Sequence, residues 1–397
     1  MMLNEATKVF VREHLSEDIH HLALRFRAVD IPGVDVTFAL NQIASRQKSK
    51  NKLPSWYSNK NIIYPPPLSL EQCSSEITAR YKSTLIKGKT FIDLTGGFGV
   101  DTAYIAQGFK KGIYVEKQEE LVKIAQHNFT QLNLSQIETI HADSEIFLSS
   151  LSSADAIFID PARRSTQGNK VVLIPDCEPN LIKIQDLLLD KAKYVLVKLS
   201  PMLDVKAALR DLKNIEQIHV LSVDNECKEL LLLMSRSCLN EPAIACVNFH
   251  ADRIQSDCFY YSEEKEMSLS FAEQIKEYLY EPNSSILKAG FYKSVARRYN
   301  VEKLGINSHL YTSSKLESDF PGRIFKVMNV SSLNKKDMKG FLSGINQANI
   351  SIRNFPMTVE GLRRKLKLRE GGDVYLFATT LGNEKRVLIK TNQLFLL

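Results

Sequence analysis

The sequence predicts an α/β protein in which a parallel sheet is covered by helices on both faces. Between residues 86 and 250, short apolar runs of strand length alternate with amphipathic runs of helix length, the pattern of βαβ units. A glycine-rich turn joins the first of these strands to the helix that follows it. The residues before and after this core follow other periods. We therefore expect a helical segment before the core and small α+β units after it.

The first segment, residues 1–85, is expected to be mainly helical. Pro65-Pro66-Pro67 ends any helix, and Ser69 is placed to cap a new one. Helical periodicity is visible in apolar residues that recur every three or four positions, namely Val11, Leu15, Ile19, Leu22 and Phe26.

The core, residues 86–250, should consist of strands and helices joined by short connections. Helices are predicted at Asp101–Gly108 and Gln118–Leu132. Gln217–Val223 and Glu229–Met234 follow one another without a helix, which predicts a hairpin, and the strand Ala243–Phe249 comes after them. The strands of the parallel sheet are expected at Thr90–Leu94, Gly112–Val115, Ile137–Ile140, Ala156–Ile159 and Tyr194–Val197.

The last two segments are expected at residues 251–325 and 326–397. The first of them should contain a helix at Ser270–Tyr280. In the second, the pattern predicts a helix at Lys335–Ala348, a strand at Ile350–Phe355, a basic helix at Val359–Leu368 and two closing strands around Gly382.

Composition excludes some classes of protein. The 397 residues carry a net charge of +7, which is compatible with a polyanionic partner but does not require one. The six cysteines have no CxxC or Cys/His spacing, so we expect neither a zinc site nor a disulfide scaffold, and no metal at all. No secretory signal or membrane span is evident, and we expect a soluble, cytoplasmic protein.

The most informative stretch runs from Phe91 to Asp101. An apolar strand ends in Asp93 and feeds a turn containing Gly97 and Gly99, which lets a ligand approach the backbone and the start of the next helix. A dinucleotide fingerprint, GxGxxG, would need a third glycine where Thr102 stands. The carboxylate of Asp93 instead favours a cationic ligand, such as S-adenosylmethionine with its ammonium and sulfonium groups.

This stretch resembles the first motif of class I methyltransferases, D/E-x-G-x-G-x-G, with Thr95 in place of the first glycine. The resemblance continues at the ends of the next three strands, where Glu116 would take the ribose hydroxyls, Asp143 would lie near the adenine amino group, and Asp160-Pro161-Ala162-Arg163 would lie beside the methyl group. It implies a Rossmann-like core. The cofactor residues it implies are Asp93, Thr95, Gly97, Gly99, Asp101, Glu116, Asp143 and Asp160.

The Asp160-Pro161-Ala162-Arg163 stretch is similar to the DPPR or DPPY signature of methyltransferases that act on nucleobases, so Asp160, Pro161 and Arg163 are the candidate catalytic residues. Amino-nitrogen enzymes usually have an aromatic residue where Arg163 stands. Uracil-C5 enzymes need a cysteine where Ser200 stands, and a serine is a poor nucleophile for that reaction. Arg163 and Arg164 could hold a phosphate, stack on a base or form a salt bridge at the rim.

The flanks resemble bacterial class I methyltransferases that carry a THUMP-like C-terminal domain after a ferredoxin-like segment. The resemblance is carried by Ile63–Lys82 before the core and, in the tail, by Arg353-Asn354-Phe355-Pro356, Leu362–Leu368 and Gly371-Gly372-Asp373. THUMP domains bind RNA, usually tRNA, so the resemblance implies tRNA or rRNA as the partner. The basic helix supports this, since its charges suit phosphate contacts: Arg363, Arg364, Lys365 and Lys367, followed by Arg369.

Three alternatives remain beside a methyltransferase of an RNA base. The protein could methylate a small molecule or a protein, or it could be a non-catalytic RNA-binding protein on the same fold. A nicotinamide oxidoreductase is disfavoured by Thr102. No general base is evident, since His127, His141 and His219 lie at positions typical of structural histidines. The sequence does not identify the methylated atom, the oligomeric state or the role of the N-terminal segment.

Overall fold

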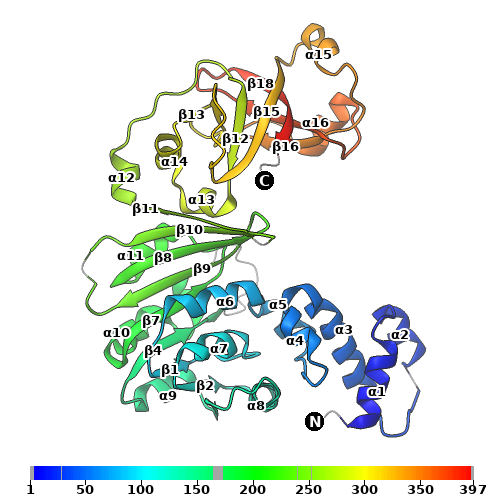
Figure 1. The fold of residues 1–397 in the computed structure, drawn as a ribbon, viewed down its shortest axis with the longest axis vertical. Coiled ribbons are helices and arrows are strands. Elements are labelled where there is room, and N and C mark those ends of the chain that lie inside the picture. The colour runs from blue at the N-terminus through cyan, green and yellow to red at the C-terminus, as the bar shows by residue number, and fades with distance from the viewer. Residues whose placement is uncertain (1–3, 28, 164–172, 239, 252, 395–397) are drawn as a thin grey trace. The chain divides into compact units, whose positions relative to one another are not determined.

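The computed structural model describes residues 4–27, 29–163, 173–238, 240–251 and 253–394 (Figure 1). The chain divides into two compact units. Unit 1 comprises Met1–Glu216 and Leu231–Asn240, and unit 2 comprises Gln217–Leu230 and Glu241–Leu397.

Unit 1 begins with the expected helical segment. Asn4, Asp18, Asp35 and Ser75 cap four of its helices, each accepting hydrogen bonds from backbone N–H groups of the first turn. The helix after the prolines begins at Pro67, so Ser69 lies inside it and is not its cap. The segment contains α1 (Glu5–His14), α2 (Ile19–Arg25), α3 (Val36–Lys52), α4 (Pro54–Ser58), α5 (Pro67–Gln72) and α6 (Glu76–Leu85).

The sheet of unit 1 has the strand order β7-β4-β1-β2-β3, with β9 beside β7. The four pairs among β1, β2, β3, β4 and β7 are all parallel, so the carboxyl ends of these strands lie at one edge. The strands are β1 (Thr90–Asp93), β2 (Lys111–Glu116), β3 (Ile137–His141), β4 (Ala154–Ile159) and β7 (Ala192–Leu199).

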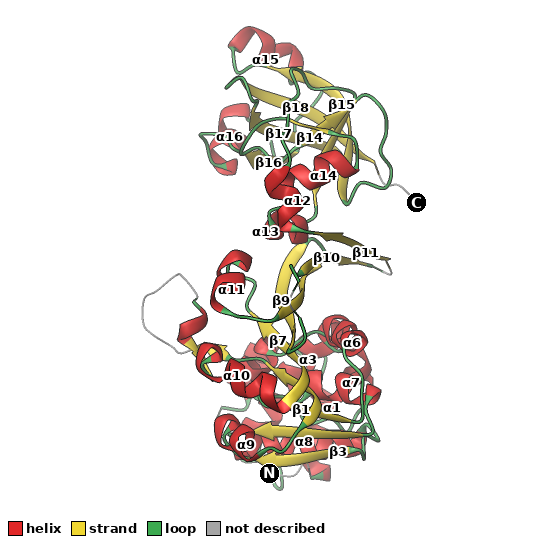
Figure 2. Cartoon of the chain, turned by 90° about the vertical axis from the view of Figure 1, so that its left-hand side faces the viewer, coloured by secondary structure: helices red, strands yellow, loops and turns green. Residues whose placement is uncertain are grey.

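Helices cover both faces of this sheet, as the alternation of elements predicted. Figure 2 shows α9 and α10 on one side of the strands and α6 and α7 on the other. A small antiparallel pair, β5 (Ala162–Arg163) and β6 (Cys177–Glu178), follows β4. The helices are α7 (Val100–Ile105), η1 (Ala106–Gly108), α8 (Glu119–Gln131), α9 (Ser144–Ser150), η2 (Ile174–Asp176), α10 (Leu181–Lys191) and α11 (Val205–Asp211).

The predicted hairpin is formed by β8 (Ile215–Val223) and β9 (Glu226–Ser235), which are neighbours in the strand order. They are joined by Asp224 and Asn225, both with positive φ, as a tight two-residue turn requires. Strand β9 belongs to unit 2 up to Leu230 and to unit 1 from Leu231. In unit 2, β10 (Ala243–His250) runs parallel to β8, and β11 (Arg253–Phe259) runs antiparallel to β10.

The rest of unit 2 is built on a second sheet of order β13-β14-β12-β15-β18-β17-β16. Its strands are β12 (Tyr278–Pro282), β13 (Glu302–Lys303), β14 (Tyr311–Ser313), β15 (Gly322–Ser331), β16 (Asn349–Arg353), β17 (Val374–Thr380) and β18 (Arg386–Leu394). Its helices are α12 (Tyr261–Glu266), α13 (Ser284–Ala289), α14 (Tyr292–Arg298), α15 (Lys335–Phe341) and α16 (Val359–Leu366).

Two helix predictions in unit 2 need correction. The helix expected at Ser270–Tyr280 is wrong, because Tyr278–Pro282 forms β12, which pairs with β14 and β15 in the middle of the sheet. Such tertiary pairing overrides local helix propensity. Helix α15 ends at Phe341 and does not reach Ala348; Gly344 follows with φ +80°, a backbone conformation that does not continue a helix.

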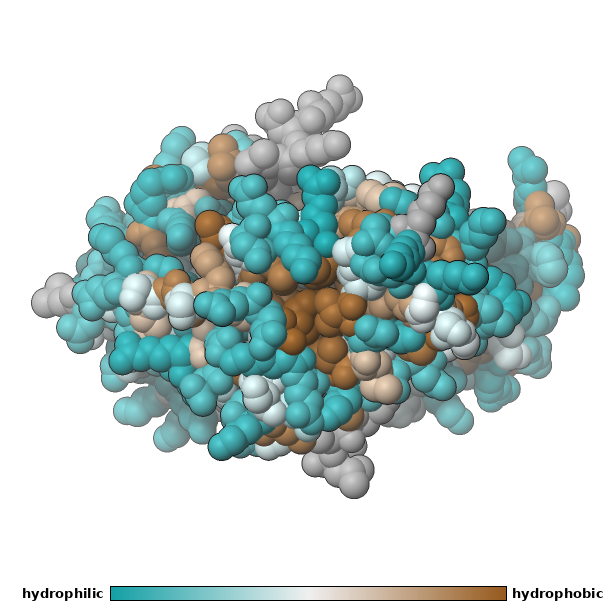
Figure 3. All heavy atoms as spheres, turned by 90° about the horizontal axis from the view of Figure 1, so that it is seen from above, coloured by the Kyte–Doolittle hydropathy of each residue, from teal (hydrophilic) through white to brown (hydrophobic). Residues whose placement is uncertain are grey.

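Figure 3 shows one face of the molecule, which is mostly hydrophilic and carries an apolar area near its centre. Among the described residues, no helix is long and apolar enough to cross a membrane.

Candidate active site

The glycine-rich turn lies where β1 ends and α7 begins. Gly97 and Gly99 have φ of +54° and +84°, conformations that side chains with a Cβ rarely adopt. A Cβ on Gly96 would lie 2.1 Å from the ring of Tyr114, and one on Gly99 would lie 2.8 Å from Phe129. At Gly97, the nearest atom is a backbone oxygen at 3.8 Å. The turn is therefore packed from below, and a ligand can approach its backbone at Gly97.

Asp93 holds the turn in shape. Its side chain is buried and accepts hydrogen bonds from the Thr95 N–H at 3.0 Å and the Thr102 hydroxyl at 2.5 Å. Burial raises the pKa of Asp93 to about 7, although both hydrogen bonds oppose that rise. Thr102, which in the sequence only weighed against a dinucleotide site, is thus a direct partner of this carboxylate.

Glu116 lies at the end of β2 and faces the same turn. Its Oε2 accepts from the Gly97 N–H and its Oε1 from the Gln118 N–H, both at 2.9 Å. The Tyr114 hydroxyl donates to the Gly97 carbonyl at 2.6 Å. Each carboxylate oxygen can accept more than one hydrogen bond, so these contacts orient Glu116 and leave it able to accept from a ligand hydroxyl.

Asp143 follows β3 and caps α9. Its Oδ1 accepts from the backbone N–H groups of Glu145 at 2.9 Å and Ile146 at 3.1 Å, and its side chain is exposed. The cap fixes this carboxylate at the same edge of the sheet as Asp93 and Glu116.

Asp160 follows β4 and forms an ion pair with Lys198, near the end of β7. Its backbone N–H donates to the Thr95 hydroxyl at 2.7 Å, which ties the fourth strand to the glycine-rich turn. Burial raises the pKa of the Asp160 carboxyl, and the attraction of Lys198 only partly offsets this effect. Pro161, the next residue, is buried.

Lys198 is a site residue that the sequence analysis missed. It stands two residues before Ser200, in the stretch that was considered only for a missing cysteine. The available signal was a lysine at the carboxyl end of a strand, where open α/β sheets bind ligands. Ser200 itself accepts from the Met202 N–H at 3.2 Å, an arrangement that shapes the loop after β7.

Asp101, expected among the cofactor residues, is bound by Lys82 of α6. The two side chains form a buried ion pair at 2.9 Å, and the Ser74 hydroxyl donates to Asp101 at 2.7 Å. Burial alone would raise the pKa of Asp101, but Lys82 and Lys198 outweigh it and hold this pKa below its ordinary value. The structure thus gives Asp101 a role in joining α6 to the core.

The N-terminal segment packs on the glycine-rich turn. Phe98, within the turn, contacts Trp56 and Tyr64 with ring centroids 4.9 and 5.9 Å apart. The backbone of Ile63 exchanges two hydrogen bonds with the side chain of Asn128 on α8, at 2.9 and 2.8 Å. The role that the sequence left open is therefore partly settled, since this segment supports the turn.

The arginines after Asp160 are described only in part. The backbone of Arg163 belongs to β5 and pairs with Cys177. The Arg163 side chain and Arg164, both expected to contact substrate, lie outside the described part of the chain.

Each of the three histidines lies within hydrogen-bond distance of an oxygen atom, and His219 lies 3.1 Å from Gln217 Oε1. His127 lies 2.9 Å from the Asn61 carbonyl oxygen, and His141 lies 3.0 Å from that of Lys117. Burial lowers the pKa of His219 to about 4, so it is neutral at physiological pH.

In unit 2, the expected RNA-contacting residues on α16 divide into two groups. Arg363 is half-buried and donates to the Ala348 carbonyl at 3.1 Å, so it helps to hold the helix in place. Arg364, Lys365 and Lys367 are exposed. Lys367 adopts φ +55° at the C-terminal cap of α16, which turns the chain sharply away from the helix.

The Arg353 of the tail motif has a structural partner. Glu281 of β12 is buried, forms an ion pair with Arg353 at 2.5 Å and accepts a hydrogen bond from Arg323 Nε at 2.8 Å. Two arginines therefore neutralise one buried carboxylate and connect three strands of the second sheet.

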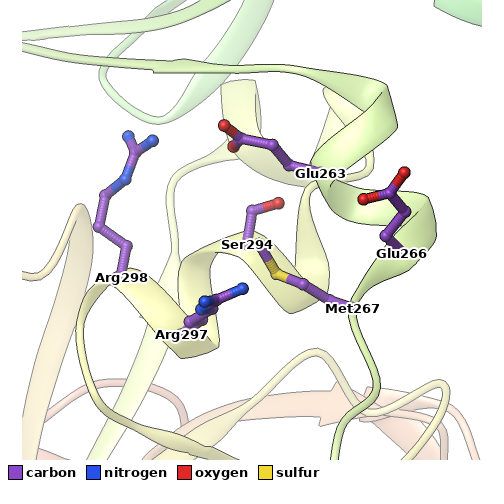
Figure 4. Close-up of a pocket in the computed structure, with 6 residues that line it drawn as sticks. All are labelled: Glu263, Glu266, Met267, Ser294, Arg297 and Arg298. Atoms are coloured by element: carbon purple, nitrogen blue, oxygen red, sulfur yellow. The ribbon is translucent and has the colours of Figure 1, made fainter.

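A separate hollow of about 660 Å³ lies within unit 2, between α12 and α14 (Figure 4). Glu263 and Glu266 come from α12, and Arg297 and Arg298 from α14. Walls with both signs of charge do not form the positive groove that a phosphate backbone requires. Among the described residues, no group of three or more His, Cys, Asp or Glu side chains is placed to hold a metal ion.

The C-terminal part of the chain matches two family models, a ferredoxin-like domain at residues 278–321 and a THUMP domain-like unit at residues 322–392. Among solved structures, a candidate methyltransferase from Porphyromonas gingivalis W83 is 33% identical, covers 100% of both chains and superposes with a TM-score of 0.89. No protein with a curated description matches the sequence.

Two further solved structures are similar over less than half of the chain. One is TrmK from M. capricolum in complex with S-adenosyl-homocysteine, with 13% identity, a TM-score of 0.31, and coverage of 44% of this chain and 70% of that chain. The other, described as an rRNA methylase from Streptococcus thermophilus, has 14% identity, a TM-score of 0.30, and coverage of 40% and 94%. Neither similarity bears on what this chain does.

A parallel sheet with a glycine-rich turn after its first strand and acidic residues after the first four defines the class I methyltransferase arrangement. The full-length similarity and the two C-terminal domains make the assignment specific. The chain belongs to the family of S-adenosylmethionine-dependent methyltransferases that carry ferredoxin-like and THUMP-like domains at the C-terminus.

Proposed function

We propose that this protein transfers the methyl group of S-adenosylmethionine to a base of tRNA or rRNA. The observation that carries the proposal is the set of carboxylates at one edge of the sheet. Asp93, Glu116, Asp143 and Asp160 follow four parallel strands, and hydrogen bonds tie Asp93, Glu116 and Asp160 to the glycine-rich turn or its Thr95.

The residues present fit this cofactor. The open backbone at Gly97 would admit the methionine part of the cofactor, and Glu116 can accept hydrogen bonds from the two ribose hydroxyls. In this proposal Asp143 accepts a hydrogen bond from the adenine amino group, and Asp160 faces the methyl group. The cofactor supplies an already activated methyl group, so the protein's contribution is to orient the target nitrogen in line with it and to exclude water.

The proposal of an RNA target is supported by the THUMP domain-like match at residues 322–392. The exposed cations Arg364, Lys365 and Lys367 on and just after α16 are suited to phosphate contacts, which position a nucleic acid without reading its sequence. The net charge of +7 is compatible with such a partner.

The test is transfer of a labelled methyl group from S-adenosylmethionine into total RNA from cells that lack this protein. We expect label in tRNA or rRNA with the native protein and none with Asp160→Ala. Calorimetry of cofactor binding with both proteins separates loss of binding from loss of transfer. A native protein that binds the cofactor but labels only protein or small molecules would contradict the RNA assignment.

A further inference from the structure

The ion pair between Asp160 and Lys198 follows directly from strand pairing. Strands β4 and β7 are parallel neighbours, and Ile159 lies opposite Val197. The next residue on each strand is therefore Asp160 and Lys198, side by side at the ligand-binding edge of the sheet. The Lys198 side chain is 12% exposed and that of Asp160 is 33% exposed, so the pair is partly shielded from water but open on one side.

The contacts of this pair leave the Asp160 carboxylate able to accept a further hydrogen bond. The Asp160 backbone is fixed through its N–H to the Thr95 hydroxyl at 2.7 Å, and Lys198 pairs with the Oδ2 atom of the carboxylate. A carboxylate has about four lone-pair positions, so Asp160 can accept a further hydrogen bond from a substrate N–H while it remains paired. An ammonium group has three donors, so Lys198 can also donate to a substrate oxygen.

These two groups together select a particular kind of nucleophile. An exocyclic amine or an unprotonated ring nitrogen becomes cationic as it attacks a methyl group, and the adjacent ammonium group of Lys198 would oppose that change. A lactam, the N–H next to a C=O in guanine and uracil, instead loses a proton and places negative charge on its oxygen. Asp160 can accept that proton, and Lys198 can stabilise the oxygen.

Resting on the proposed RNA-methyltransferase function, we propose that Asp160 and Lys198 are a catalytic pair for methylation of a lactam ring nitrogen, the N1 of guanine or the N3 of uracil. The ring N–H bond breaks and its proton passes to the Asp160 carboxylate. The ring nitrogen forms a bond to the methyl carbon as the carbon–sulfur bond breaks. The sulfonium becomes a neutral thioether, and Lys198 holds the lactam oxygen throughout.

The first test identifies the product. RNA from cells lacking the protein is methylated by the purified full-length enzyme, digested to nucleosides and analysed by mass spectrometry against authentic standards. We expect 1-methylguanosine or 3-methyluridine, and the two standards show whether the methylated base is guanine or uracil. A methyl group on an exocyclic amine, on adenine or on a ribose hydroxyl would overturn this inference and leave RNA methylation intact. An absence of methylated RNA would overturn both.

The second test examines the pair itself. Lys198→Met should lower kcat by roughly 10²-fold, as expected for loss of a donor to a developing oxyanion, and should move the acidic limb of the pH–rate profile to higher pH. Lys198→Arg keeps the charge and should leave that limb near its native position. Lys183→Met, at an exposed lysine on α10, is the matched control and should change neither quantity.

The third test measures the protonation of Asp160 without catalysis. Carbon-13 NMR of aspartate-labelled protein, with the Asp160 signal assigned from Asp160→Asn, should show the Asp160 carboxyl titrating at higher pH in Lys198→Met than in the native protein. An unchanged titration, or an unchanged pH–rate limb, would overturn the assigned role of Lys198.

Discussion

At the residue scale, the most unusual group of the site is the buried carboxyl of Asp93. Its side chain accepts hydrogen bonds from two uncharged donors, the Thr95 N–H and the Thr102 hydroxyl. Burial therefore dominates and raises its pKa to about 7. A carboxyl with a raised pKa binds a proton more tightly in the folded protein than in the unfolded chain, so its contribution to stability is present at low pH and is lost as the pH rises.

This sign gives a pH prediction. The native protein should lose stability relative to Asp93→Asn as the pH rises from about 4 to about 7, by at most about 1.4 kcal/mol per pH unit, and the difference should level off above that range. Urea unfolding of both proteins between pH 5 and pH 8 measures it. The difference in stability between the two proteins is compared because both contain His219 and His309. Burial lowers the pKa of these histidines to about 4, so their titration changes stability in the opposite direction and is the same in both proteins.

Asp155→Asn is the control for this experiment. The Asp155 carboxyl accepts from the Lys89 and Thr90 N–H groups, and these bonds lower its pKa, so it does not titrate between pH 5 and pH 8. Parallel pH curves for Asp93→Asn and the native protein would show that the Asp93 pKa is ordinary.

At the scale of elements, α6 is joined to α7 by the buried pair Lys82–Asp101. Lys82 is fully buried, and its ammonium group also donates to the Ser74 hydroxyl at 2.7 Å. Because α7 begins directly after the glycine-rich turn, this pair couples the segment before the core to that turn.

Removing one member of the pair should be costly. Lys82→Met leaves Asp101 buried without its closest cation and should destabilise the protein by about 3–5 kcal/mol, the usual effect of breaking a buried pair. The double variant Lys82→Met with Asp101→Leu should regain most of this loss, since no unpaired charge remains. Urea unfolding of the two variants measures both values, and a double variant no more stable than the single one would contradict the explanation.

At the scale of the whole molecule, the two units are expected to divide the work. The residues proposed to bind the cofactor belong to unit 1, and the exposed cations of α16 belong to unit 2. RNA affinity and cofactor affinity should therefore be separable by mutation.

Charge reversal on α16 tests this division. Arg364→Glu, Lys365→Glu and Lys367→Glu together should weaken RNA binding and flatten its dependence on salt, by about 0.7 in the logarithmic slope for each lost contact to a single strand. Cofactor affinity by calorimetry should not change. The control is a triple variant at exposed lysines of unit 1, Lys87→Glu, Lys123→Glu and Lys183→Glu. It makes the same change in net charge and should weaken RNA binding less than the α16 variant does. Equal effects would show that net charge alone governs binding.

The sequence by itself determined the parallel core, the order of its strands along the chain and the positions of the glycines and carboxylates. These features are local, because the periodicity of apolar residues and the backbone freedom of glycine are written in short stretches such as Phe91–Asp101. The family resemblance was carried by similarly short motifs.

Only the tertiary structure decided which groups meet. Lys198 joins Asp160 because β4 and β7 are neighbours in register, and Lys82 joins Asp101 because α6 packs against α7, pairings between residues 38 and 19 positions apart. The strand β12 was mistaken for a helix for the same reason, since its stability comes from β14 and β15. Contacts over such separations depend on packing of the whole chain, and no local pattern encodes them.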